Sequence, residues 1–102
     1  MRLGTVIGRV TLSQQDPAYL GARFLLVQPL LPAQMHGAAQ PPLAKGSTVV
    51  VYDNLGAGSG HLVGFTEGAE AAVPFDQPTP VDAFNAAIID RIFYHPPATA
   101  AK

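Results

Sequence analysis

The sequence predicts a mainly β fold, a small five-stranded OB-like barrel with one short helix near the C-terminus. Three observations support this prediction. The chain of 102 residues has the length of one domain. Ten glycines and ten prolines divide it into short segments. Those segments are rich in β-branched and aromatic residues, which favour strands, and a barrel pairs most of the edges that a few short strands expose.

The first half of the chain supplies two of the predicted strands. Residues 2–12 alternate in polarity and are rich in Val, Ile and Thr, so they predict a strand. Asp16 and Pro17 then start a turn that Gly21 closes. Residues 23–31 are predominantly apolar and predict the second strand.

The third and fourth predicted strands flank a glycine-rich loop. Residues 32–46 are rich in Pro, Ala and Gly and predict a long connection. Residues 47–55 predict the third strand, which is centred on three consecutive valines. Residues 61–66 predict the fourth strand, and the irregular composition of residues 67–79 predicts no regular element.

The predicted helix spans residues 80–86. Thr79 suits the N-cap, proline suits the first helical position, and Asp82 complements the helix dipole. Residues 88–94 carry the β-branched and aromatic content of a fifth strand. A continuation of the helix also fits the apolar spacing of this region. We expect one domain over residues 1–95 and a disordered tail over residues 96–102.

The composition points to a subunit of a larger assembly. Charged residues make up 13% of the chain and hydrophobic residues 48%, which leaves little charge to cover a lone small domain. We therefore expect other protein to cover part of its surface. The net charge of −1 and the absence of a basic stripe argue against a nucleic-acid partner.

Other classes are excluded by residues that the chain lacks. Without cysteine it has no disulfide, thiol catalysis or Cys-based zinc site. No apolar run is long enough for a membrane span, and the first ten residues do not resemble a signal peptide. We expect a cytosolic protein without a membrane partner.

The loop between the third and fourth strands sets Gly56, Gly58 and Gly60 at alternate positions. A phosphate-binding loop has a different glycine spacing and opens a helix. Here a strand follows, and the loop contains no Lys or Arg. The pattern therefore predicts a tight turn, or a loop pressed against a neighbouring backbone.

The chain contains no convincing catalytic or metal-ligating set. None of His36, His61 and His95 has a partner at a metal-ligand spacing, so we expect no metal and no cofactor. Ser59 and His61 would share one face of an extended strand, and Asp53 is the nearest acid, but nothing else supports a nucleophilic site. We expect no enzymatic activity. In a ring with cyclic symmetry, however, His61 could form a cluster around the axis.

Four blocks of the sequence, in order and spacing, resemble the EutN/CcmL family. They are MRLGTVIGRV, DPAYLGARFLLVQPL, GAGSGHLV and PVDAFNAAIIDRI. The resemblance implies OB-like barrels, five of which form a pyramid-shaped homopentamer that closes a vertex of a bacterial microcompartment shell. It also implies a structural role without catalytic residues, beside hexameric and pseudohexameric shell proteins that tile the facets.

The resemblance also implies a candidate site. The glycine loop matches that of the family, and we expect it near the pentamer axis or at the subunit contact. His61 departs from the family, which commonly has an acid there, so the charge around the axis should differ. The residues predicted to form this pore or subunit-interface loop are Gly56, Ala57, Gly58, Ser59, Gly60 and His61.

The sequence leaves two alternative functions open. The first is an OB-type binding module for single-stranded nucleic acid or a small ligand, which would need a basic groove with exposed aromatic rings. The second is a small hydrolase that uses Ser59 and His61, which ranks last.

Overall fold

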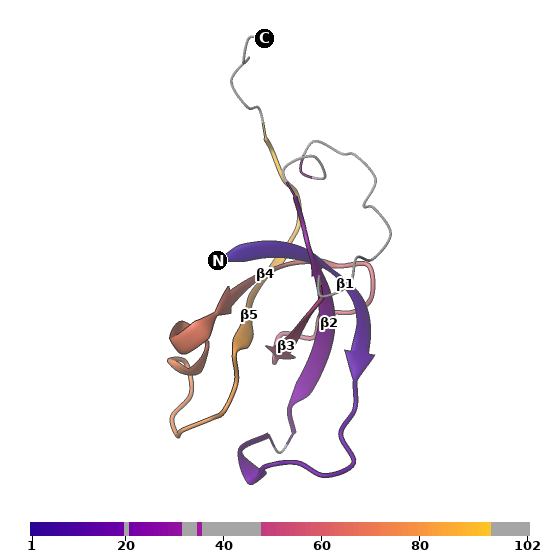
Figure 1. Ribbon diagram of the computed structural model, residues 1–102. Coiled ribbons are helices and arrows are strands. Elements are labelled where there is room, and N and C mark those ends of the chain that lie inside the picture. The colour runs from indigo at the N-terminus through magenta and orange to yellow at the C-terminus, as the bar shows by residue number, and fades with distance from the viewer. Residues whose placement is uncertain (20, 32–34, 36–47, 95–102) are drawn as a thin grey trace.

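The computed structural model describes residues 1–19, 21–31, 35 and 48–94, and within them five strands close into a barrel (Figure 1). The sheet is antiparallel except where β3 meets β5. The barrel predicted from the sequence is confirmed. In barrel order, its strands are β1 (Arg2–Val10), β2 (Arg23–Pro29), β3 (Val49–Asp53), β5 (Ala83–Ile89) and β4 (Leu62–Glu67).

The longest strand, β1, pairs with two neighbours and closes the barrel. Its first residues pair with β4, and most of its length pairs with β2. The register with β2 shifts between Val6 and Gly8, as a bulge does when it bends a strand. The bend lets β1 pair with both β2 and β4 and so close a small barrel.

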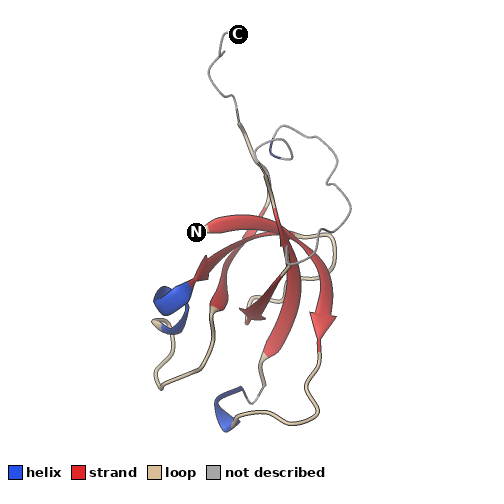
Figure 2. Cartoon of the chain, viewed as in Figure 1, coloured by secondary structure: helices blue, strands red, loops and turns tan. Residues whose placement is uncertain are grey.

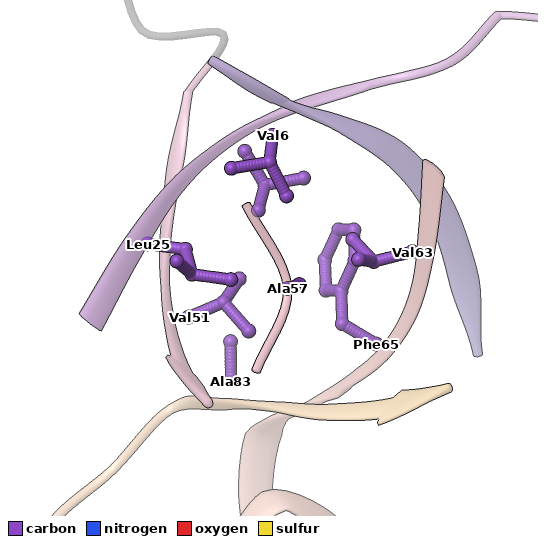
Figure 3. Close-up of a cluster of buried hydrophobic side chains, with 8 residues drawn as sticks. Val6, Leu25, Val51, Ala57, Val63, Phe65 and Ala83 are labelled. Carbon is purple, nitrogen blue, oxygen red and sulfur yellow. The ribbon is translucent and has the colours of Figure 1, made fainter. Parts of the chain in front are cut away.

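The core is a compact cluster of aliphatic side chains around Phe65. Val6, Leu25, Val27, Val51, Val63 and Ala83 contribute from the strands, together with Ala57 from the glycine loop. Figure 3 shows Ala57 between Leu25 and Val51 on one side and Val63 and Phe65 on the other. The loop therefore inserts a side chain into the barrel instead of only crossing its end.

The prediction of a helix over residues 80–86 is wrong, because strand β5 begins at Ala83. Ala83 and Asn85 are buried inside the barrel, while Phe84 between them contacts an aromatic cluster outside it. This two-residue alternation, together with pairing to β3 and β4, outweighs the local helix-start signals. The Thr79 hydroxyl donates to the Gln77 carbonyl at 3.0 Å and does not cap a helix.

The helical turns lie outside the strands (Figure 2). They are η1 (Pro17–Tyr19) in the predicted turn and η2 (Gly68–Ala72) in the segment predicted to be irregular. The fifth strand ends at Ile89, earlier than predicted. The tail predicted over residues 96–102 and most of the predicted loop over 32–46 lie outside the described residues. Within the described part of the chain, no helix is long and apolar enough to cross a membrane.

The turn between β1 and β2 forms as the sequence predicts. The Asp16 carboxylate accepts a hydrogen bond from the Ala18 amide at 2.8 Å, and Gly21 has a φ of 81°. The Tyr19 hydroxyl donates to the Pro80 carbonyl and so joins η1 to the segment before β5. Burial raises the pKa of this hydroxyl above its ordinary value of 10.0, and the carboxylates of Asp16 and Asp82 raise it further. The hydroxyl therefore keeps its proton, and remains a donor, to a higher pH than an ordinary tyrosine.

A cluster of five aromatic rings covers the outside of β2, β3 and β5. Neighbouring ring centroids lie 4.8–5.9 Å apart, mostly edge to face, an arrangement that stabilises aromatic pairs. The rings belong to Tyr19, Phe24, Tyr52, Phe75 and Phe84. Because they pack against one another, they do not form the open stacking platform that a single-strand-binding module uses.

Gly4→Ala should destabilise the protein by about 1–3 kcal/mol, the usual cost of overpacking. A Cβ at Gly4 would lie 2.4 Å from Val27 Cγ1 and 2.9 Å from the Gln28 carbonyl oxygen. Backbone on β2 would have to move. Urea unfolding at fixed protein concentration measures the effect. The matched control is Gly8→Ala on the same strand, whose Cβ would meet its nearest atom at 3.4 Å, and equal losses in the two variants would contradict the argument.

Candidate functional site

The glycine loop, residues 54–61, is bonded to the middle of β1. The Gly60 amide donates to the Val6 carbonyl at 2.8 Å, and the Val6 amide donates to the His61 carbonyl at 2.9 Å. These bonds lie beside the bulge of β1. The loop therefore continues the β1–β4 pairing and is fixed at its C-terminal end.

A buried carboxylate fixes the N-terminal part of the loop. Asp53 ends β3 and is 1% exposed. Its oxygens accept hydrogen bonds from the amides of Leu55, Gly56 and Ala57, each at 3.1 Å. A carboxylate that accepts several backbone N–H groups holds a turn rigidly.

Two side chains complete the surroundings of Asp53. The Asn85 amide donates to Asp53 Oδ1 at 2.8 Å. The Arg23 guanidinium donates to Asp53 Oδ2 at 2.9 Å and to the Ala57 carbonyl at 3.1 Å. Arg23 thus neutralises the buried charge and also binds the loop backbone, while 37% of its side chain remains exposed.

Arg23 and Asn85 are the residues that sequence reasoning missed. Asp53 appeared only as a possible orienting acid, yet a lone acid at the end of an apolar strand signals a buried polar network. Arg23 is its cross-strand partner in the register of β2 and β3. That register, which the sequence does not provide, is what would have identified the pair.

The three glycines of the loop differ in whether their backbone conformation requires a glycine. Gly56 and Gly60 have φ values of 90° and 88°, which residues with a side chain rarely adopt. Gly58 lies outside this left-handed region, and a Cβ built there would meet no described atom within 4 Å. Neither Gly56 nor Gly60 is crowded by the described chain either. The expected pressure from a neighbouring backbone therefore does not come from the described part of the same chain.

Two of the three residues considered for catalysis, His61 and Asp53, make other hydrogen bonds. His61 Nδ1 accepts a hydrogen bond from the Gly58 amide at 2.8 Å, and the His61 amide donates to the Gly58 carbonyl at 3.0 Å. Asp53 is bound by the loop and by Arg23, so it does not orient His61 toward Ser59. Among the described residues, no three His, Cys, Asp or Glu side chains are grouped to hold a metal ion. His36 and His95 lie outside the described residues.

An open cleft of about 230 Å³ lies between the glycine loop and the bulged part of β1, and we call it the arginine cleft. Arg9 and Arg23 line it, and Gly58 and Ser59 border it from the loop. Core residues Val6 and Leu25 lie at its base, each only 1% exposed. The cleft is therefore lined mainly by two basic residues and the loop, a combination suited to a group that carries an acid.

Comparison with known proteins gives one consistent result. The family model described as "Ethanolamine utilisation protein EutN/carboxysome" matches residues 1–90. The carboxysome shell vertex protein CcmL of Gloeobacter violaceus is 36% identical over 93 residues, which cover 90% of this chain and 85% of that protein.

Solved structures agree with the sequence match. The structure of Gloeobacter violaceus CcmL superposes with a TM-score of 0.76 at 35% identity and covers 92% of this chain and 90% of its own. GrpN, a pentameric microcompartment shell protein from Rhodospirillum rubrum, superposes with a TM-score of 0.72 at 29% identity and covers 94% of this chain and all of its own. With its barrel and its glycine loop both inside the matched residues 1–90, the chain belongs to the EutN/CcmL family.

Proposed function

We propose that this protein is a structural subunit of a bacterial microcompartment shell, and that five copies form the pentamer that caps a vertex. The observation that carries the proposal is the likeness to a shell vertex protein, at 36% identity over 90% of the chain. The family model matches residues 1–90, which include the whole barrel and the glycine loop. The proposed location is the shell itself, within the cytoplasm.

The surface of the single chain supports this role. Apolar side chains are exposed on different sides of the barrel, among them Val50, Leu55, Val73 and Ile88. Val73 is 76% exposed and Val50 is 49% exposed. Burying such side chains between subunits would stabilise an oligomer by about 25 cal/mol for each Å² removed from water.

The glycine loop is proposed to lie at the subunit contact or to line the opening on the axis. Gly58 supports this assignment, because neither its backbone conformation nor packing against the described chain requires a glycine. A neighbouring subunit close to this position would require one. The facets around the vertex are proposed to consist of hexameric and pseudohexameric shell proteins, with which the pentamer would form its outer contacts.

Native mass spectrometry of the purified full chain tests the proposal. The expected result is a single dominant species of five chains that persists on dilution into the micromolar range. Multi-angle light scattering at several concentrations provides an independent mass. A folded monomer at every concentration, shown by circular dichroism to retain its β structure, would overturn the proposal.

A further inference from the structure

A closed ring of identical subunits needs two different surfaces on each chain. In a cyclic assembly each subunit presents one surface to the subunit before it and another to the subunit after it. The two surfaces must lie on different sides of the barrel and must complement each other in shape and charge. Two surfaces among the described residues carry unpaired charges of opposite sign.

The first surface is the arginine cleft. Arg9 is exposed, and it has no ion pair with any residue in the described ranges. The charge of Arg23 is already balanced by buried Asp53. The cleft therefore carries the uncompensated positive charge of Arg9.

The second surface is the helical turn η2 with Val73, which we call the η2 knob. Gly68, Ala69 and Glu70 are exposed, and Val73 after them is the exposed apolar side chain described above. Glu70 has no ion pair within the described part of the chain, whereas Glu67 just before it binds Arg2 at 3.0 Å. The knob therefore presents one free carboxylate among small and apolar groups.

The two surfaces lie on opposite sides of the barrel. The ion pair between Arg2 and Glu67 places η2 beside the start of β1. Arg9 lies seven residues farther along this strand, about 23 Å away at about 3.3 Å per residue. Figure 1 shows η2 at the left of the barrel and the end of β1 at the right. One subunit cannot join its own two surfaces, but adjacent subunits of a ring can.

We infer that the η2 knob of one subunit docks in the arginine cleft of the next, with Glu70 beside Arg9 and Arg23. This inference rests on the proposed function, because it requires a ring. Docking would pair two charges that are uncompensated in the described chain and bring the exposed Val73 side chain against the neighbouring subunit. It would also account for Gly58, since a side chain there would occupy the space of the incoming knob.

Glu70 suits the cleft better than Asp16, Asp82 or Asp76. Asp16 already accepts a hydrogen bond in its own turn, and Asp82 lies close enough to Tyr19 to raise the pKa of its hydroxyl. Asp76 lies beyond Val73, outside η2. Around Glu70 the side chains are only glycine and alanine, so a neighbouring backbone can approach closely.

Charge reversal tests the contact. Glu70→Arg and Arg9→Glu, each alone, should weaken the pentamer by about tenfold or more in the concentration at which half of it dissociates, because like charges then face each other at every interface. A single chain that carries both changes restores opposite charges at every interface and should assemble within about threefold of the unmodified protein. Asp76→Arg, an acid outside the knob, is the matched control and should assemble normally. Native mass spectrometry over a dilution series measures the four variants and the unmodified protein.

The outcomes separate this inference from the function on which it rests. A monomeric unmodified protein would overturn both. A pentameric protein whose single variants assemble normally, or whose double variant is no better than the single ones, would overturn the docking contact and leave the pentamer standing. The milder Glu70→Gln should also remove most of the salt dependence of dissociation. An unchanged salt dependence in that variant would contradict the contact without relying on charge reversal.

Discussion

Asp53→Ala is expected to lower the free energy of unfolding by about 3–5 kcal/mol, the range found when one partner of a buried ion pair is removed. The substitution leaves the Arg23 guanidinium without its counter-ion and the Asn85 amide without its acceptor. The amides of the glycine loop also lose their acceptor. Since small domains are stable by about 5–15 kcal/mol in total, this loss removes a large part of the protein's stability.

Chemical denaturation followed by circular dichroism, at fixed protein concentration, measures this loss. The matched control is Glu67→Ala, which removes an exposed carboxylate paired to Arg2 at the same 3 Å separation. Exposed ion pairs contribute about 0–1 kcal/mol, so this variant should unfold almost as the unmodified protein does. Similar losses in the two variants would show that Asp53 is not the centre of a buried network.

Gly58→Arg is expected to abolish the pentamer and leave the barrel folded. Within the described chain a side chain at this position meets open space, so the monomer has room for it. In the proposed ring the arginine would fill the arginine cleft and add a third positive charge to it. Native mass spectrometry should show monomers, while circular dichroism and the unfolding midpoint of the monomer should stay close to those of a folded barrel.

The control for Gly58→Arg is Asn54→Arg in the same loop. Asn54 is exposed and does not line the arginine cleft. The Asn54→Arg substitution introduces the same side chain and the same charge a few residues away from Gly58. If both variants remain pentameric, the glycine loop does not lie at the subunit contact. If both dissociate, added charge anywhere in the loop is sufficient, and the specific role of Gly58 is wrong.

The strands were predictable from the sequence because their signals are local. Alternating apolar residues and the glycines and prolines between them identify β1 to β4 with small errors at the ends. The error over residues 80–86 has a physical cause. Thr79, Pro80 and Asp82 form a good helix start, but in the barrel a strand, β5, fills the place between β3 and β4. Pairing with two distant strands is a tertiary effect that local propensity does not contain.

The site was predictable only in part for a related reason. The glycine spacing identified the loop, and the following strand excluded a phosphate-binding function. The residues that hold the loop come from β2 and β5, 30 and 32 positions away from Asp53. Which of these residues face Asp53 depends on strand register. Nothing in the neighbourhood of the loop in the sequence encodes that register.

The support of the glycine loop from inside the barrel also affects how its outer surface can change. Asp53 and Arg23 hold the backbone of the loop, and His61 accepts a hydrogen bond from the Gly58 amide, whereas Ser59 is simply exposed at the edge of the arginine cleft. A substitution at Ser59 can therefore alter the chemistry that the loop presents with little effect on its path, while a substitution at His61 also removes a hydrogen bond within the loop. In a ring, a new charge, aromatic ring or metal ligand at position 59 would be repeated at every copy and would face whatever occupies the cleft.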